Sequence, residues 1–163
     1  MACELKRLIL IGAGLPDLVI NRRGTGQAVT RVRENRNQVG DRSFKGNLIG
    51  TGNKNYSPTM RWIVSTLMDE NQLLIFEQYV YTFELNPAVN YTLQDRWRRL
   101  PDNQAGIHTR QIITGTTRTY AGYSESFYSF VVKLDIKDND YVQEQGGNLY
   151  LVNFSLAEIA LPQ

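Results

Sequence analysis

The sequence has little of what most catalytic and metal-binding sites need. It contains one cysteine, Cys3, and one histidine, His108, in 163 residues. A single cysteine cannot form a disulfide within the chain, so stability has to come from the core or from association. A zinc site built from thiolates and imidazoles lacks ligands, and we expect neither a metal nor another cofactor. Nothing around Cys3 resembles an activated nucleophile, so we expect no catalytic residues and no enzymatic activity.

Long apolar runs and internal repeats are also missing. No apolar stretch approaches the roughly 20 residues that a membrane span needs, so we expect no membrane partner. Hydrophobic residues make up 42% of the chain and charged residues 21%, which is ordinary for a folded soluble protein. Length and composition together predict a single domain over residues 1–163.

The stretch LILIGAGLPD has the start of a dinucleotide-binding fingerprint, a strand followed by Gly12 and Gly14. Asp17 occupies the position of the third glycine, and Pro16 interrupts the place where the phosphate-binding helix should begin. We therefore expect a tight turn after a strand rather than a nucleotide site.

Two other stretches also lack residues that the motifs they resemble require. GNLIGTGNK, residues 46–54, has no glycine before its final lysine and no Ser or Thr after it, so it does not match a phosphate loop. The acids between Asp135 and Glu144 do not have the ligand spacing of a calcium loop. We expect a loop in the first place and turns between strands in the second.

Positive charge is concentrated in the first third of the chain. Residues 1–55 contain ten Lys/Arg and four Asp/Glu, whereas the remaining residues contain eight and twelve. Such asymmetry favours a basic segment that meets an acidic surface, a neighbouring copy or nucleic acid. Residues 34–58 have too few apolar side chains to bury themselves, so we expect a long basic loop or hairpin, here called the basic arm, over about residues 21–58. Its candidate interface residues are Arg31, Arg33, Arg36, Arg42, Lys45 and Lys54.

The remaining pattern predicts a mainly β protein, an antiparallel β-sandwich or barrel with one packed α-helix. Strands are expected at 5–11, 18–20, 28–33, 60–67, 90–97, 107–114, 127–136 and 148–156. The helix is expected over about residues 69–82, because acidic residues begin it and Leu73, Phe76 and Val80 form one apolar stripe.

Two basic clusters have an expected place on strands. In the strand 28–33, Val29, Arg31 and Arg33 share one face, so this face should meet solvent or a charged partner. The second cluster, Arg96-Trp97-Arg98-Arg99, is expected at a strand end that faces solvent.

Three segments carry a family resemblance: the strand VTRVR (29–33), the strand RWIVSTL (61–67), and the acidic link with its helix (69–81). Their order resembles that of small tail-tip proteins of long-tailed bacteriophages, of the lambdoid minor tail protein M type, and more broadly of distal-tail and baseplate ring proteins. The resemblance implies a tail-tube-like β domain whose copies form a ring, a hexamer or trimer, around a lumen that passes DNA without reading its sequence. It also implies other phage tail proteins as partners, assembly in the host cytoplasm, and a final location in the virion tail.

Our leading hypothesis is therefore a non-catalytic structural virion protein. One alternative is a small-ligand or carbohydrate-binding β module that uses the aromatic residues Tyr91, Trp97, Tyr120, Tyr123 and Tyr128. A further alternative is a nucleic-acid binder that uses Arg31, Arg33 and Arg36, although we expect no sequence-specific recognition.

Overall fold

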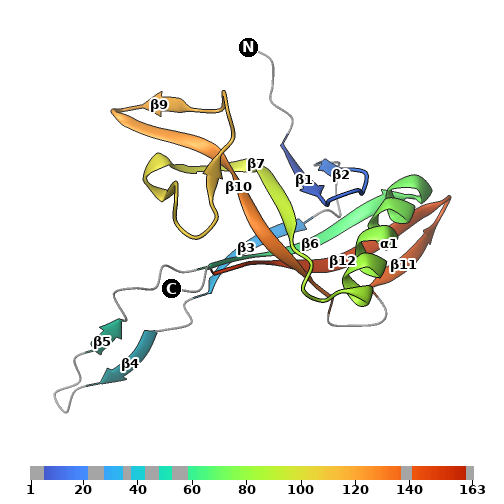
Figure 1. Ribbon diagram of the computed structural model, residues 1–163, viewed down its shortest axis with the longest axis horizontal. Helices are drawn as coiled ribbons and strands as arrows, with labels where there is room; N and C mark the ends of the chain where they lie inside the picture. Colours follow the sequence, from blue (N-terminus) through green and yellow to red (C-terminus); the bar gives the residue numbers. More distant parts are fainter. Residues whose placement is uncertain are drawn as a thin grey trace.

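The structure, a computed structural model, describes residues 6–21, 28–34, 38–42, 48–52, 59–136 and 141–160. These residues form a mainly β protein with one α-helix, which confirms the predicted fold class (Figure 1). The strands are β1 (Arg7–Ile11), β2 (Leu18–Asn21), β3 (Ala28–Glu34), β4 (Gln38–Arg42), β5 (Leu48–Gly52), β6 (Thr59–Asp69), β7 (Tyr91–Pro101), β8 (Gln111–Ile112), β9 (Arg118–Tyr120), β10 (Tyr123–Asp135), β11 (Val142–Gly146) and β12 (Leu149–Glu158). The helices are α1 (Glu70–Leu85) and the short 3-10 helix η1 (Asp102–Gln104).

One antiparallel sheet contains ten of these strands. Its main path runs β2-β1-β7-β10-β12-β6-β3, with β8 and β9 paired to β10 and β11 paired to β12. The sheet is curled into a half-barrel (Figure 1). Its concave side holds the core, because alternate residues of each strand point to the same face. In β10, for example, Tyr128, Phe130, Val132 and Leu134 are all at most 2% exposed.

Helix α1 packs against the concave side. Asp69 caps it: its carboxylate accepts from the Gln72 N–H at 2.8 Å, and the Gln72 side chain accepts from the Asp69 N–H. Phe76 and Val80 are buried and Leu73 packs against the core, as the predicted stripe requires. The helix continues to Leu85, past the predicted end at residue 82.

Tyr79 of α1 fixes the hairpin formed by β1 and β2. Its buried hydroxyl accepts from the Gly12 N–H at 3.1 Å and lies 2.9 Å from the Leu10 carbonyl oxygen and 2.7 Å from that of Pro16, to one of which it donates. A Cβ on Gly12 would lie 2.9 Å from Tyr79 Cε1. The glycine therefore allows close packing beneath the helix. It stands in the turn between β1 and β2, as the sequence predicted, and not in a loop that binds a nucleotide.

Some expectations about strands are wrong. Of the predicted strand 107–114, only Gln111–Ile112 pairs with β10, because residues 106–110 form local turn hydrogen bonds instead. The cluster at residues 96–99 does not end a strand, since β7 continues to Pro101. Strands β4, β5, β9 and β11 were not among those expected; β4 and β5 pair with each other inside the basic arm, apart from the main sheet (Figure 1).

Candidate functional site

The concave side of the half-barrel contains a buried ion pair between two strands that are not neighbours. Arg31 of β3 donates from Nε to Asp95 Oδ2 of β7 at 2.6 Å and from Nη2 to Oδ1 at 2.7 Å. Trp62 of β6 donates from Nε1 to the same carboxylate at 2.9 Å. The side chains of Arg31 and Asp95 are only 9% and 4% exposed. Because β3 and β7 are separated by three strands in the sheet order, this pair holds the curl of the sheet together.

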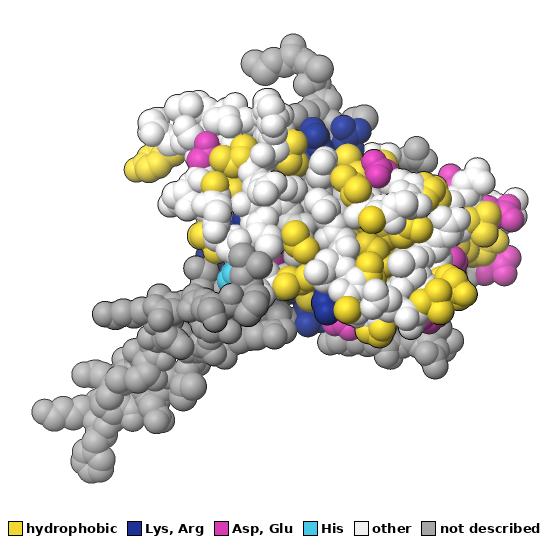
Figure 2. Space-filling view, in the orientation of Figure 1, with side chains coloured by type: hydrophobic (Ala, Val, Ile, Leu, Met, Phe, Trp, Pro, Cys, Tyr) yellow, Lys and Arg dark blue, Asp and Glu magenta, His cyan; other side chains and the backbone are white. Residues whose placement is uncertain are grey.

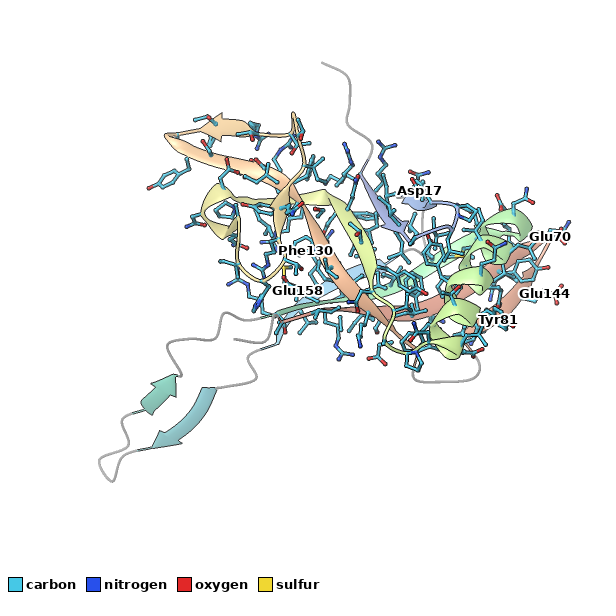
Figure 3. The ribbon with its side chains drawn as sticks, in the orientation of Figure 1. Asp17, Glu70, Tyr81, Phe130, Glu144 and Glu158 are labelled. Carbon is cyan, nitrogen blue, oxygen red and sulfur yellow. The ribbon has the colours of Figure 1, made fainter. Side chains whose placement is uncertain are left out.

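A second buried ion pair lies beside it. Arg110 donates from Nε to Glu158 Oε1 at 2.7 Å and from Nη2 to Oε2 at 2.9 Å, and Oε2 also accepts the Met60 N–H at 2.8 Å. The Arg110 guanidinium lies 5.6 Å from the centre of the Phe130 ring, which meets Trp62 edge-on at 4.7 Å. Phe130 thus separates the two ion pairs, and Figure 3 shows it close to Glu158 inside the curl.

These ion pairs indicate a structural role for the interior. Each carboxylate is held by a bidentate arginine and by a further N–H donor, so the desolvated charges are compensated. The sequence analysis did not identify either pair. A signal did exist: Asp95 interrupts the apolar face formed by Tyr91 and Leu93, where a charge requires a buried partner.

The predicted interface residues of the basic arm have different environments. Arg31 lies on the strand face that was expected to meet solvent or a charged partner. Its charged partner is Asp95, which belongs to the same chain. Arg33 is exposed on β3. Arg36, Lys45 and Lys54 lie outside the described residues, and Arg42 belongs to β4, of which only the backbone is described.

The outward face of α1 exposes several apolar side chains. Leu74, Tyr81 and Leu85 are 58%, 62% and 69% exposed, and the other exposed residues of the helix include Glu70, Gln78 and Glu84. Figure 2 shows hydrophobic side chains gathered over the part of the surface where α1 lies, and Figure 3 shows Tyr81 on its outer side. A helix that packs one face on the core usually places polar residues on the other, so three large exposed apolar side chains there are unusual.

A surface cavity of about 420 Å³ lies between η1 and the hairpin of β9 and β10. Tyr120 and Tyr123, 74% and 80% exposed, line it together with Asp102, whose Oδ1 is buried without a hydrogen-bond partner. Of the aromatic residues suggested for ligand binding, Tyr91 and Tyr128 are instead core residues, at 2% and 0% exposure.

Burial keeps several tyrosines protonated. It raises the pKa of Tyr79 to about 12. Burial, followed by the hydrogen bond to Glu77, raises the pKa of Tyr141 to about 12. Burial also raises the pKa values of Tyr91 and Tyr128. These phenols therefore act as hydrogen-bond donors at neutral pH and not as bases.

Within the described part of the chain, no group of three or more His, Cys, Asp or Glu side chains is placed to hold a metal ion. The helices described there include none with the length and hydrophobicity to cross a membrane. Comparisons with known protein families, curated proteins and solved structures give no significant match to this chain.

Proposed function

We propose that this protein is a non-catalytic structural subunit that binds further copies of itself, as a ring in a bacteriophage tail. The observation that supports this best is the outward face of α1, where Leu74, Tyr81 and Leu85 are exposed. Subunit interfaces have a centre enriched in aromatic residues and a polar rim, and the exposed Tyr81, Leu74 and Leu85 fit such a centre. The phage tail itself is suggested by the resemblance of residues 29–81.

The arrangement of the surfaces favours a head-to-tail contact. Helix α1 lies on one side of the half-barrel, whereas the hairpins β4–β5 and β9–β10 extend from the other (Figure 1). Contacts between unlike surfaces close into rings when the rotation per subunit fits. The charges are complementary, because the helix bears Glu70, Glu77 and Glu84 around its apolar face while the excess of Lys/Arg lies in residues 1–55.

Sedimentation velocity over a range of concentrations, with electron microscopy of the purified chain, tests this proposal. The wild type should form ring-shaped oligomers, and the double variant Leu74→Lys/Leu85→Lys should remain monomeric with an unchanged circular dichroism spectrum. Ile63→Lys is the matched control, because Ile63 is 46% exposed on the convex side of the sheet, and it should assemble like the wild type. A wild type that stays monomeric, or an α1 variant that assembles normally, would refute the proposal.

The cavity beside Tyr120 and Tyr123 favours a second candidate function, a small-ligand or carbohydrate-binding module. Exposed aromatic rings beside polar groups are the usual lining of such sites. A glycan array and a thermal-shift screen should then find a ligand whose stabilisation is lost in Tyr123→Ala and kept in Tyr81→Ala. If no ligand gives saturable stabilisation, this candidate is excluded.

A further inference from the structure

Strand β7 contains a large bulge opposite β10. Ser126 of β10 pairs with Leu100, and Tyr128 pairs with Asp95, so residues 96–99 stand opposite Phe127 alone. These four residues are Arg96, Trp97, Arg98 and Arg99. Bulges occur often beside functional sites, where they redirect side chains that a regular strand would place on alternate faces.

Two contacts hold the bulge in shape. The Trp97 N–H donates to Asp95 Oδ1 at 2.9 Å, so the carboxylate that binds Arg31 also fixes the start of the bulge. At the other end, the Arg99 guanidinium lies 4.2 Å from the centre of the Phe127 ring, a cation–π contact. The arginines of the bulge are therefore carried on a fixed backbone.

The bulge forms the wall of a surface cavity of about 350 Å³. Cationic side chains from three strands or their ends converge there, and among the described residues the lining contains a single carboxylate, Glu125, which already pairs with Arg118 at 2.6 Å. The rings of Trp97 and Phe127 complete the lining. The four cationic residues of this cavity, here called the bulge pocket, are Lys6, Arg98, Arg99 and Arg118.

We propose that the bulge pocket binds phosphate groups of a phosphate ester such as a nucleotide unit. Lys6 and Arg98 bring positive charge to the pocket in addition to the Arg118–Glu125 pair, so the pocket attracts an anionic ligand. Arginine forks match phosphate geometry, and a phosphate offers more acceptor oxygens to donors that arrive from several directions than a carboxylate does. The cavity is also larger than a bare phosphate requires, and the Trp97 ring at its wall offers an apolar face to a base or sugar.

This proposal is independent of self-association, because the bulge pocket and the outward face of α1 share no residue. It also requires no recognition of sequence, since phosphate contacts position a nucleic acid without reading it.

Binding can be measured with two probes on the whole chain: inorganic pyrophosphate by calorimetry, and a fluorescent oligothymidylate by anisotropy at several salt concentrations. The key variant is Arg98→Glu, because Arg98 is exposed and the substitution leaves the core intact. The matched control is Lys133→Glu, because Lys133 does not line the bulge pocket and the substitution changes the net charge equally. Trp97 supplies a local signal, since the other tryptophan, Trp62, is fully buried.

We expect saturable binding that Arg98→Glu weakens about tenfold and Lys133→Glu leaves nearly unchanged. For the oligonucleotide, Arg98→Glu should also reduce the slope of log affinity against log salt by about 0.7. Binding should change the tryptophan fluorescence of the wild type and not that of Trp97→Phe. If both probes bind, a free phosphate group suffices; if only the oligonucleotide binds, the source is nucleic acid. Failure of both to saturate, or equal weakening by the two charge reversals, would overturn the proposal.

Discussion

Asp95 accepts hydrogen bonds from Arg31 Nε and Nη2, from Trp62 Nε1 and from the Trp97 N–H, and replacement by alanine would remove the acceptor from all of them. Removing one partner of a buried ion pair costs roughly 3–5 kcal/mol, and an unsatisfied buried donor costs about 1–3 kcal/mol more. We therefore expect Asp95→Ala to lower the free energy of unfolding by at least about 4 kcal/mol. That is a large part of the roughly 5–15 kcal/mol that holds a domain folded.

Urea unfolding followed by tryptophan fluorescence and circular dichroism measures this loss. With a denaturant slope of roughly 2 kcal/mol per molar, 4 kcal/mol lowers the midpoint by about 2 M. Asp95→Asn gives a second measurement in case the alanine variant does not fold. It keeps the shape and one acceptor oxygen, so we expect a smaller loss of about 1.5–3 kcal/mol.

Asp135→Ala is the matched control, because Asp135 pairs with Arg61 at 2.5 Å on the convex side, where the side chains are 34% and 19% exposed. Exposed ion pairs contribute about 0–1 kcal/mol, so its midpoint should fall by no more than about 0.5 M. The double variant Arg31→Met/Asp95→Leu should recover much of the loss, since apolar residues often replace a buried ion pair without cost. Equal midpoints for Asp95→Ala and Asp135→Ala would refute the assigned role of the buried pair.

Three further predictions concern α1 and its contacts. Folded Tyr79 keeps its proton up to about pH 12, whereas the unfolded chain releases it near pH 10. Its contribution to stability is therefore full below pH 10 and declines by about 3 kcal/mol in all as the pH rises to 12. Between pH 8 and pH 11 the urea midpoint should decline less steeply in Tyr79→Phe than in the wild type, and as steeply as in the wild type in Tyr81→Phe. Gly12→Ala should cost about 1–3 kcal/mol in the same assay, because its Cβ would meet the Tyr79 ring at 2.9 Å, and a neutral result would show that the ring moves aside. Asp69→Ala should cost about 0.5–2 kcal/mol through loss of the helix cap and Asp69→Asn much less, which thermal melts can distinguish.

Local patterns in the sequence were sufficient to predict most of the secondary structure. The acidic start of α1 and its stripe at Leu73, Phe76 and Val80 predicted a helix that the structure places at Glu70–Leu85. Alternation predicted the long strands β7, β10 and β12, because one face of each is buried and the period of two is visible in the residue types. The short strands β9 and β11 were missed, since their residues are largely exposed and show no such alternation.

The pairing of charges could not be predicted, because it depends on how far the sheet curls. Arg31 and Asp95 are 64 residues apart, and their strands are not neighbours in the sheet. A strand face with two arginines indicates solvent or a charged partner, and only the curl decides that the partner of Arg31 lies within the same chain. The bulge of β7 could not be predicted for a similar reason. Its residues resemble a solvent-facing strand end, and only the register with β10 shows that they form a bulge.

Asp95 couples the closure of the half-barrel to the shape of the bulge pocket. One of its oxygens, Oδ1, accepts from both Arg31 and the Trp97 N–H, so loss of the carboxylate frees the first residues of the bulge as well as the buried guanidinium. Asp95→Asn should therefore weaken phosphate binding even where the chain stays folded, although Asp95 does not line the pocket. The α1 variant Leu74→Lys/Leu85→Lys should leave phosphate binding intact. The two variants should differ because Asp95→Asn alters a hydrogen bond that the bulge itself makes, whereas the α1 variant does not.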